Sequence, residues 1–379
     1  MKKAATHIIV GAISFIIGFF TKSIIAGVVV FFKPKLESRE VDVEISQVTQ
    51  MEMERGFVYT GGIRNGHRFG SGRMTTPKGS IYEGEWVDNE IISGMMITRD
   101  AEYDGEFKKL SPDGYGTMKY RDGSFYRGMW QDGAKSGIGL FVDSIGRKKF
   151  GLWKKGLIEK KTENLYVDKT CFGIDLSHHN SINDWGNMAL FAKRNGLVYT
   201  TNPPSDEYYF LPIDFVILKA TEGATHRDKD YLSNMNKAKK HHKKRGSYHF
   251  MHLTSSSIEE QVNNFLDYIV YEEGDLPPVL DVEVVGQAEA IGINATRQKV
   301  LMWLELVEEK MGIKPIIYTS ANMKKDYFNS DEFAEYDFWI AHYKDSEPDF
   351  KDYKIWQFTN KGKLYGNNLG DFDVNINKF

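Results

Sequence analysis

Apolar and polar residues follow three different patterns along this chain, and each pattern predicts a different kind of structure. Residues 8–32 form an almost continuous apolar run with one charge, Lys22. Residues 56–156 repeat a short alternation of aromatic residues, glycines and polar residues. From residue 171 onward, short apolar runs alternate with longer stretches of helical periodicity. We therefore predict a membrane-spanning segment, a repeat array and an α/β domain, in that order.

The apolar run at residues 8–32 is long enough to cross a membrane. About 20 apolar residues span the roughly 30 Å hydrocarbon layer, so we predict an uncleaved signal-anchor over residues 1–35. A polar juxtamembrane stalk over residues 36–55 would follow it. The competing interpretation is a cleaved signal peptide, but a cleavage site needs small residues before it, and Ile24 and Ile25 are unfavourable there. Basic residues flank the run on both sides and leave its orientation open.

Glycines and aromatic residues recur at a near-constant period in residues 56–156. The unit aromatic-x-Gly-x-aromatic appears at residues 59–63, 82–86, 103–107, 126–130 and 149–153, with the first and last units degenerate. Asp-Gly pairs between the units are hairpin signals. One unit cannot bury its aromatic face alone, so the units must stack. The pattern resembles the MORN repeat family, which implies an all-β array of hairpins over residues 56–156, followed by a linker over residues 157–170.

The repeats themselves point to structure rather than to chemistry. We expect the aromatic residues to form the core of the array, because they recur together with the glycines of the hairpins. No dense cluster of lysine and arginine marks a lipid headgroup site. A protein or lipid partner of the repeats is therefore left open. We expect the array to act as a stiff spacer between the membrane and the following domain.

Eight short apolar runs after residue 171 predict strands, and helical stretches lie between several of them. Such alternation over about 200 residues is typical of a parallel α/β barrel. We therefore predict an α/β fold for residues 171–379, an irregular TIM-like (β/α) barrel. The predicted strands are residues 173–176, 215–220, 246–251, 279–284, 315–319, 338–341, 354–358 and 372–374, and the predicted helices include residues 229–244, 257–272 and 296–311.

Four acidic residues lie where such a barrel places its chemistry, at the carboxyl ends of strands. They are Asp175, Asp281, Glu283 and Asp373. Because side chains alternate along a strand, Asp281 and Glu283 point the same way. Neighbouring carboxylates repel each other, which raises one pKa and keeps one acid protonated near neutral pH. A protonated acid beside a carboxylate is the arrangement that cleaves glycosidic bonds.

Composition excludes several other classes of function. The 49 basic and 52 acidic residues give a net charge of −3, which does not support a nucleic-acid partner. The single cysteine, Cys171, excludes an intramolecular disulfide and any cysteine-rich metal site. Adjacent residues such as His178 and His179 point apart and make a poor chelate. We therefore expect no metal and no cofactor, since no phosphate loop or dinucleotide motif stands out either.

A resemblance to a known family becomes specific in the C-terminal half. Nine motifs in order resemble glycoside hydrolase family 25, the Chalaropsis-type lysozymes or N-acetylmuramidases. This resemblance implies an irregular barrel and hydrolysis of the β-1,4 bond between N-acetylmuramic acid and N-acetylglucosamine in peptidoglycan. The motifs are residues 173–178, 184–185, 215–223, 246–250, 280–283, 315–319, 339–341, 355–358 and 373–375.

The resemblance also implies roles for individual residues. Glu283 would be the general acid, and Asp281 would orient or stabilise the acetamido group of the substrate. Asp175 and Asp373 would complete the acidic floor. Substrate-binding residues would be Tyr248 and, with a packing role equally open for most of them, His178, Lys219, Glu222, Trp339, Tyr343 and Gln357.

Three points remain open from the sequence alone. Residues 197–211 look like an insertion relative to the family, and they either shape the groove or dock on the repeats. The enzyme competes with a wall-binding scaffold whose barrel is catalytically silent, and with an enzyme for another amino-sugar polymer such as chitin. Because peptidoglycan lies outside the cytoplasm, we expect a single-pass protein of the bacterial envelope. Its N-terminus would be cytoplasmic and its catalytic domain extracytoplasmic.

Overall fold

A computed structural model describes most of the chain between residues 49 and 377. The described residues are 49–53, 56–161, 171–193, 198, 200–201, 208–344, 346–350, 352–367 and 370–377. Residues 46–379 form one compact unit. The predicted membrane segment, residues 8–32, lies outside the described residues. Among the described residues, no helix is long and apolar enough to cross a membrane.

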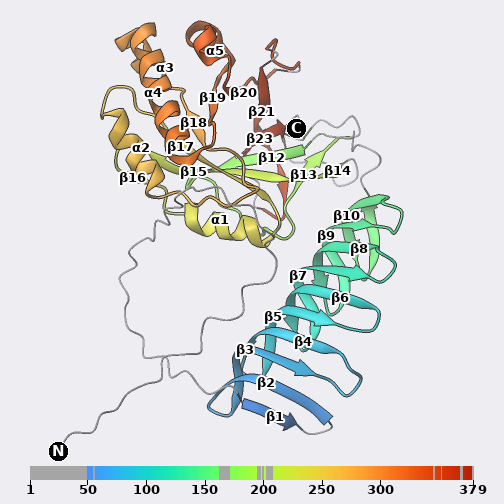
Figure 1. Cartoon of the computed structure of the whole chain (residues 1–379). Helices are drawn as coiled ribbons and strands as arrows, with labels where there is room; N and C mark the ends of the chain where they lie inside the picture. Colours follow the sequence, from blue (N-terminus) through green and yellow to red (C-terminus); the bar gives the residue numbers. More distant parts are fainter. Residues whose placement is uncertain are drawn as a thin grey trace, which may run out of the picture. The chain divides into compact units, whose positions relative to one another are not determined.

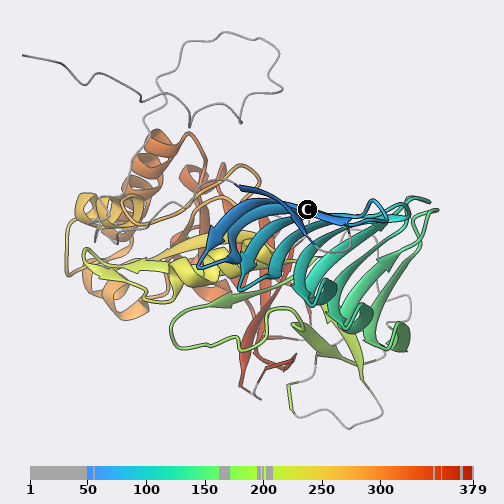
Figure 2. The same ribbon diagram turned by 90° about the horizontal axis from the view of Figure 1, so that it is seen from below.

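The repeats form one antiparallel sheet of eleven strands in sequence order, and Figure 2 shows its hairpins following one another in a twisted row. β1 lies in the predicted stalk and β11 in the predicted linker, so the sheet extends beyond residues 56–156 at both ends. The strands are β1 (Thr49–Met53), β2 (Phe57–Arg64), β3 (His67–Thr75), β4 (Ile81–Val87), β5 (Glu90–Ile97), β6 (Ala101–Lys108), β7 (Ser111–Tyr120), β8 (Phe125–Gln131), β9 (Ala134–Val142), β10 (Lys148–Lys154) and β11 (Leu157–Lys161).

A row of paired glycines explains why the repeat period is so regular. Glycine faces glycine across every strand pair from β2 to β10. The missing side chains leave room for the tyrosines of the repeats: a Cβ on Gly116 would lie 2.3 Å from the Tyr103 hydroxyl oxygen. Tryptophans complete the contact, as where Trp130 Nε1 donates to the Gly116 carbonyl at 3.2 Å. The aromatic residues are therefore the core of the array, as predicted.

The C-terminal half forms a closed barrel of eight strands (Figure 1). The ring closes because β12 pairs with both β15 and β23. The short strand β16 (His226–Arg227) pairs with the end of β15. In order around the ring, the eight strands are β12 (Cys171–Leu176), β15 (Phe215–Glu222), β17 (Lys244–Phe250), β18 (Val279–Asp281), β19 (Ile316–Ser320), β20 (Asp337–Ala341), β21 (Tyr353–Gly362) and β23 (Phe372–Asn377).

The predicted fold class of residues 171–379, an α/β TIM-like (β/α) barrel, is wrong. Among the described residues, strand is the commonest structure, with 47% strand and 19% helix. Seven barrel strands run parallel, but β23 is antiparallel to both of its neighbours. Only residues 363–371 connect β21 to β23, which is shorter than the dozen or more residues that a parallel crossover needs, so β23 returns antiparallel. The described α-helices are α1 (Tyr231–Lys240), α2 (Ile258–Leu266), α3 (Val285–Ile291), α4 (Ile293–Met311) and α5 (Ala321–Tyr327).

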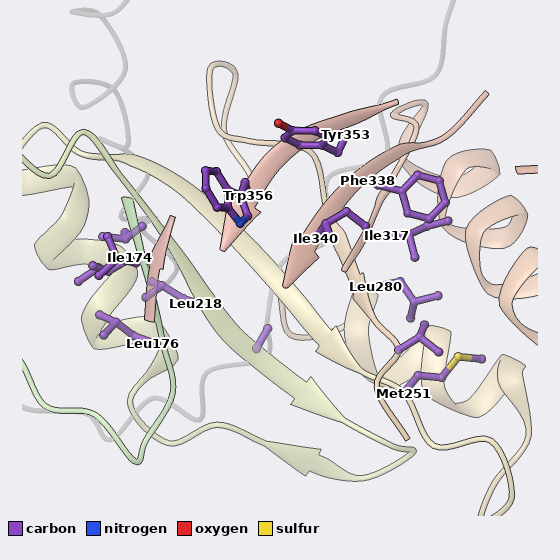
Figure 3. Packing of buried hydrophobic residues seen from close by; sticks show 14 of the residues in the cluster. Ile174, Leu176, Leu218, Met251, Leu280, Ile317, Phe338, Ile340, Tyr353 and Trp356 are labelled. Atoms are coloured by element: carbon purple, nitrogen blue, oxygen red, sulfur yellow. The ribbon is translucent and has the colours of Figure 1, made fainter. Parts of the chain in front are cut away.

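Side chains alternate between the inside and the outside of the barrel. The outward residues pack under the helices, and Figure 3 shows part of this outer core around Leu280, Ile317 and Phe338. The inward residues form a second, smaller core that includes Phe215, Ile217, Val279, Ile316 and Ile355. The same inward rows end in polar residues toward the carboxyl ends of the strands, and these residues form the site.

A three-stranded sheet lies beside the barrel, in the order β14-β13-β22. It consists of β13 (Ala189–Ala192), β14 (Tyr209–Pro212) and β22 (Leu364–Tyr365). The described part of the insertion therefore forms a hairpin. Phe210 of this hairpin packs with Ile138 and Phe150 of the repeats in one apolar cluster. Of the two possibilities that the sequence left open, docking on the repeats is the one observed.

Candidate active site

The four predicted carboxylates come from three barrel strands. Asp175 lies on β12 and Asp373 lies directly opposite it on the antiparallel strand β23. Asp281 ends β18, and Glu283 follows two residues later. The charge of Glu283 raises the pKa of Asp175, Asp281 and Asp373, although burial is the larger cause in each case. The barrel therefore brings all four residues together at one mouth.

Asp175 is held from two sides by amide groups. Gln357 Nε2 donates to Asp175 Oδ2 at 2.9 Å, and Asn375 Nδ2 donates to the same oxygen at 2.8 Å. Trp339 Nε1 in turn donates to Asn375 Oδ1 at 2.7 Å. Because the indole can only donate, it fixes which end of the Asn375 amide faces Asp175. The carboxylate therefore has a defined position at the floor of the barrel mouth.

Two tyrosines contact the second amide, that of Gln357. The Tyr318 hydroxyl donates to Gln357 Oε1 at 3.0 Å, and the Tyr343 hydroxyl donates to the same oxygen at 2.6 Å. Tyr318 is buried, whereas Tyr343 is 50% exposed. The network therefore runs from the open mouth down to Asp175.

The Asp175 and Asp373 carboxyl groups lie close enough that their negative charges repel each other. Burial, and then the charge of Asp373, raises the pKa of Asp175 to about 8. Burial, and then the charge of Glu283, raises the pKa of Asp373 to about 6. Both shifts disfavour the ionised form, so the two carboxyl groups together carry fewer than two negative charges near neutral pH.

Asp281 and Glu283 occupy different environments although only one residue separates them. Asp281 is buried, and burial followed by the charge of Glu283 raises its pKa well above the usual range. Its Oδ1 atom has no hydrogen-bond partner among the described residues. Glu283 is exposed to solvent, yet the surrounding protein still removes enough water to raise its pKa, against the opposing charge of Lys219. Glu283 is thus the accessible acid, and Asp281 is a buried acceptor in need of a donor.

Lys219, Glu222 and His252 form a charged cluster beside the carboxylates. Lys219 Nζ lies 2.6 Å from Glu222 Oε2, and His252 Nε2 lies 2.9 Å from Glu222 Oε1. These two partners hold the pKa of Glu222 below its usual range, although burial alone would raise it. Glu222 is therefore a fixed anion, unlike the four carboxylates at the floor.

The other predicted substrate-binding residues occupy varied positions. Burial, and then the charge of Asp281, raises the pKa of the Tyr248 hydroxyl. Because Asp281 acts on it, this hydroxyl lies near the carboxylates. His178 Nδ1 lies 2.8 Å from Oδ2 of the buried Asp228. Trp339 and Gln357 are each only 2% exposed, so they lie beneath the floor of the site. That these residues bind substrate stays a prediction.

Three residues of the site were not singled out from the sequence. Asn375 and Tyr318 hold the Asp175 network, and His252 holds Glu222. Asn375 shares a strand face with Asp373, two residues away, so strand alternation could have found it. His252 carries no such signal, because it follows β17 in a loop. Among the described residues, no group of three or more His, Cys, Asp or Glu side chains is placed to hold a metal ion.

Comparisons with known proteins identify the two halves of this unit. Residues 174–367 match glycosyl hydrolases family 25. Residues 59–81, 82–91, 103–125 and 126–146 match the MORN repeat. The uncharacterised protein YegX of Escherichia coli K12 is 32% identical over 213 residues, which are 55% of this chain and 69% of YegX.

Two lysozymes are also similar to this chain. The autolytic lysozyme of Clostridium acetobutylicum is 30% identical over 156 residues, covering 41% of this chain and 46% of that protein. The crystal structure of a bacterial lysozyme from Streptomyces coelicolor is 25% identical, with a TM-score of 0.44, and covers 54% of this chain and 90% of its own.

The chain belongs to glycosyl hydrolases family 25, since the match covers half of its length. It is therefore a glycoside hydrolase, and within that class a peptidoglycan hydrolase of the lysozyme type.

Proposed function

We propose that this chain cleaves the β-1,4 bond between N-acetylmuramic acid and N-acetylglucosamine, with Glu283 as the general acid. The observation that carries the proposal is the difference in environment between the exposed Glu283 and the buried Asp281. Glu283 reaches solvent and has a raised pKa, so a protonated form is available to a glycosidic oxygen. No other carboxyl group of the site combines exposure with a raised pKa in this way.

Asp281, Asp175 and Asp373 would then act on the sugar. The partnerless Asp281 Oδ1 offers an acceptor for the N–H group of a substrate acetamide. That hydrogen bond would aim the acetamide oxygen at the anomeric carbon as the leaving group departs. Asp175 and Asp373 supply negative charge below the ring, where positive charge develops in the transition state. The amides of Gln357 and Asn375 keep that charge in place.

The bond that is cleaved can be tested directly. Purified peptidoglycan is digested with the full chain, the new reducing ends are converted to alcohols with borohydride, and the products are analysed by mass spectrometry. Cleavage after N-acetylmuramic acid yields muramitol ends, whereas cleavage after N-acetylglucosamine yields glucosaminitol ends. Muramitol ends are expected, and glucosaminitol ends or activity on chitin alone would refute the proposal.

Glu283→Gln tests the acid itself. The amide keeps the size of the side chain but has no proton to donate, and general acid catalysis contributes about 10²–10⁴-fold. Glu289→Gln, an exposed residue of α3, is the matched control. A Glu283→Gln variant with the rate of the control would exclude Glu283 as the acid.

We further propose that the enzyme acts in the bacterial envelope, outside the cytoplasm, with residues 8–32 at the membrane. The location of the polymer and the apolar character of residues 8–32 support this proposal. Cell fractionation and protease protection of the full chain in intact cells test it. Removal of residues 1–35 should leave the rate on isolated wall unchanged, since the site residues all lie beyond residue 171. A full chain found only in the cytoplasmic fraction would contradict the location.

A further inference from the structure

The small sheet of β13, β14 and β22 has two apolar faces, each with a different partner. Leu190, Leu211 and Leu364 face the barrel and belong to its outer core. The neighbouring residues of the same strands face the opposite way, as strand alternation requires. This second set packs against the repeats and consists of Ala189, Phe191, Phe210 and Tyr365.

The last hairpin of the repeats, β9–β10, supplies the other half of that contact. Ile138 and Phe150 are 3% and 9% exposed, and Leu140 and Leu152 pack against the same cluster. These apolar residues would be exposed to water without the small sheet, so the β9–β10 hairpin and the small sheet cover each other's apolar faces.

A hydrogen bond fixes the position of the hairpin on the barrel. The Ile138 N–H donates to Asn187 Oδ1 at 2.9 Å, and Asn187 is itself tied to Asp184, with Nδ2 donating to Oδ2 at 2.6 Å. The approach is so close that a Cβ on Gly137 would lie 2.1 Å from Asn187 Oδ1. This contact therefore tolerates only glycine and sets one relative position.

The small sheet is built from the two chain segments that border the Asp175–Asp373 pair. β13 belongs to the segment that connects β12, with Asp175, to β15. β22 lies between β21, with Gln357, and β23, with Asp373. The two segments are joined by the β13–β22 ladder and by Asn183 N–H donating to Asn367 Oδ1 at 2.7 Å. Anything that holds the small sheet thus holds both borders of the pair.

We propose that the β9–β10 hairpin of the repeats is a positioning element for catalysis, which holds the loops on either side of the Asp175–Asp373 pair. This inference rests on the proposed function. It replaces the expectation that the repeats are only a spacer. A spacer would affect access to the wall, whereas a positioning element affects turnover on any substrate.

Gly137→Ala in the full chain tests the proposal, and Gly146→Ala is its matched control. Both glycines have positive φ, +54° and +84°, so both variants carry the same kind of backbone cost. A Cβ on Gly146 meets nothing within 4 Å, whereas a Cβ on Gly137 meets Asn187. A Cβ on Gly137 also lies 3.0 Å from Met129 Cβ within the repeats, so a second variant is needed to separate the barrel contact from a local effect.

The substrate is a soluble glycan fragment of peptidoglycan, so that tethering plays no part. Small displacements of catalytic groups cost up to about 100-fold in rate, and we expect kcat to fall about tenfold for Gly137→Ala, with KM little changed. The pH–rate profile should shift to lower pH, because a loosened pair is better hydrated. Amide hydrogen exchange of β13 and β23 should accelerate in Gly137→Ala and not in Gly146→Ala.

Phe150→Ala is a second variant that changes only the repeat side of the apolar cluster. The same loss of kcat and of exchange protection in β23 is expected. An unchanged kcat in a variant whose amide exchange in β13 and β23 is accelerated would overturn the proposal. If the unaltered chain itself released no reducing ends, the proposed function would fail, while exchange in β23 would still decide whether the hairpin holds the loops.

Discussion

The half-buried Asp175 carboxylate should destabilise the folded protein at alkaline pH, and Asp175→Asn should remove that cost. The substitution keeps the shape of the side chain, and its oxygen still accepts the hydrogen bonds from Gln357 and Asn375. It removes a group whose pKa rises from 3.8 to about 8 on folding, through burial and then through the charge of Asp373. A variant that loses activity should therefore gain stability.

The sign follows from the direction of the shift. A carboxyl group with a raised pKa in the folded state costs nothing below the unfolded value, near pH 4. As the pH rises from there toward about 8, the unfolded chain has lost the proton that the folded protein retains, so the free energy of unfolding falls progressively. At about 1.4 kcal/mol per pKa unit, the cost at pH 8 is at most about 6 kcal/mol. We expect a gain of about 2 kcal/mol for Asp175→Asn, because Asp175 is only half-buried and solvent screens part of the penalty.

Urea unfolding at about pH 4 and about pH 8 measures the effect. The difference in the free energy of unfolding between variant and unaltered chain should be near zero at the lower pH and positive at the higher one. Asp326→Asn, an exposed residue of α5, controls for the general loss of one negative charge. The reasoning would be refuted if Asp175→Asn were equally destabilising at both pH values, since Asp175 would then contribute hydrogen bonds without a charge penalty.

Three further predictions concern the site and the repeats. Glu283→Gln should lower kcat by about 10²–10⁴-fold without loss of stability, as measured by reducing-sugar release and thermal unfolding. Trp339→Phe removes the donor to Asn375 Oδ1, so it should lower kcat and cost about 1 kcal/mol of stability; an unchanged kcat would mean that Asn375 needs no fixing. Gly116→Ala places a Cβ 2.3 Å from the Tyr103 hydroxyl oxygen, and it should lower the melting temperature of the repeats while leaving the rate on soluble fragments unaltered.

The sequence predicted the elements of the barrel better than their arrangement. Strands were found at all eight predicted places, because each reads as a short apolar run bounded by turns. The direction of β23 could not be read from such a run, since it depends on the connection before it. Residues 359–371 hold no helix pattern, and this absence was the signal against a regular (β/α) barrel.

The acidic residues of the site were predicted from the sequence, whereas the residues that hold them by hydrogen bonds were not. Asp281 and Glu283 stood out because two acids two residues apart follow a buried strand. Tyr318 and Asn375 did not stand out, because neither residue type implies a carboxylate partner from another strand. The sequence left the docking of residues 197–211 on the repeats as one of two possibilities, since an apolar residue such as Phe210 in an insertion does not reveal which surface covers it.

The reversed strand β23 also governs when the protein becomes an enzyme during its synthesis. Asp175 comes from the first strand of the barrel, whereas Asp373 and Asn375 come from the last. The barrel cannot close until β23, the strand that pairs with β12, has emerged from the ribosome. A partly translated chain therefore lacks the floor of the site, and under the proposed mechanism it would be inactive until the whole barrel has been made.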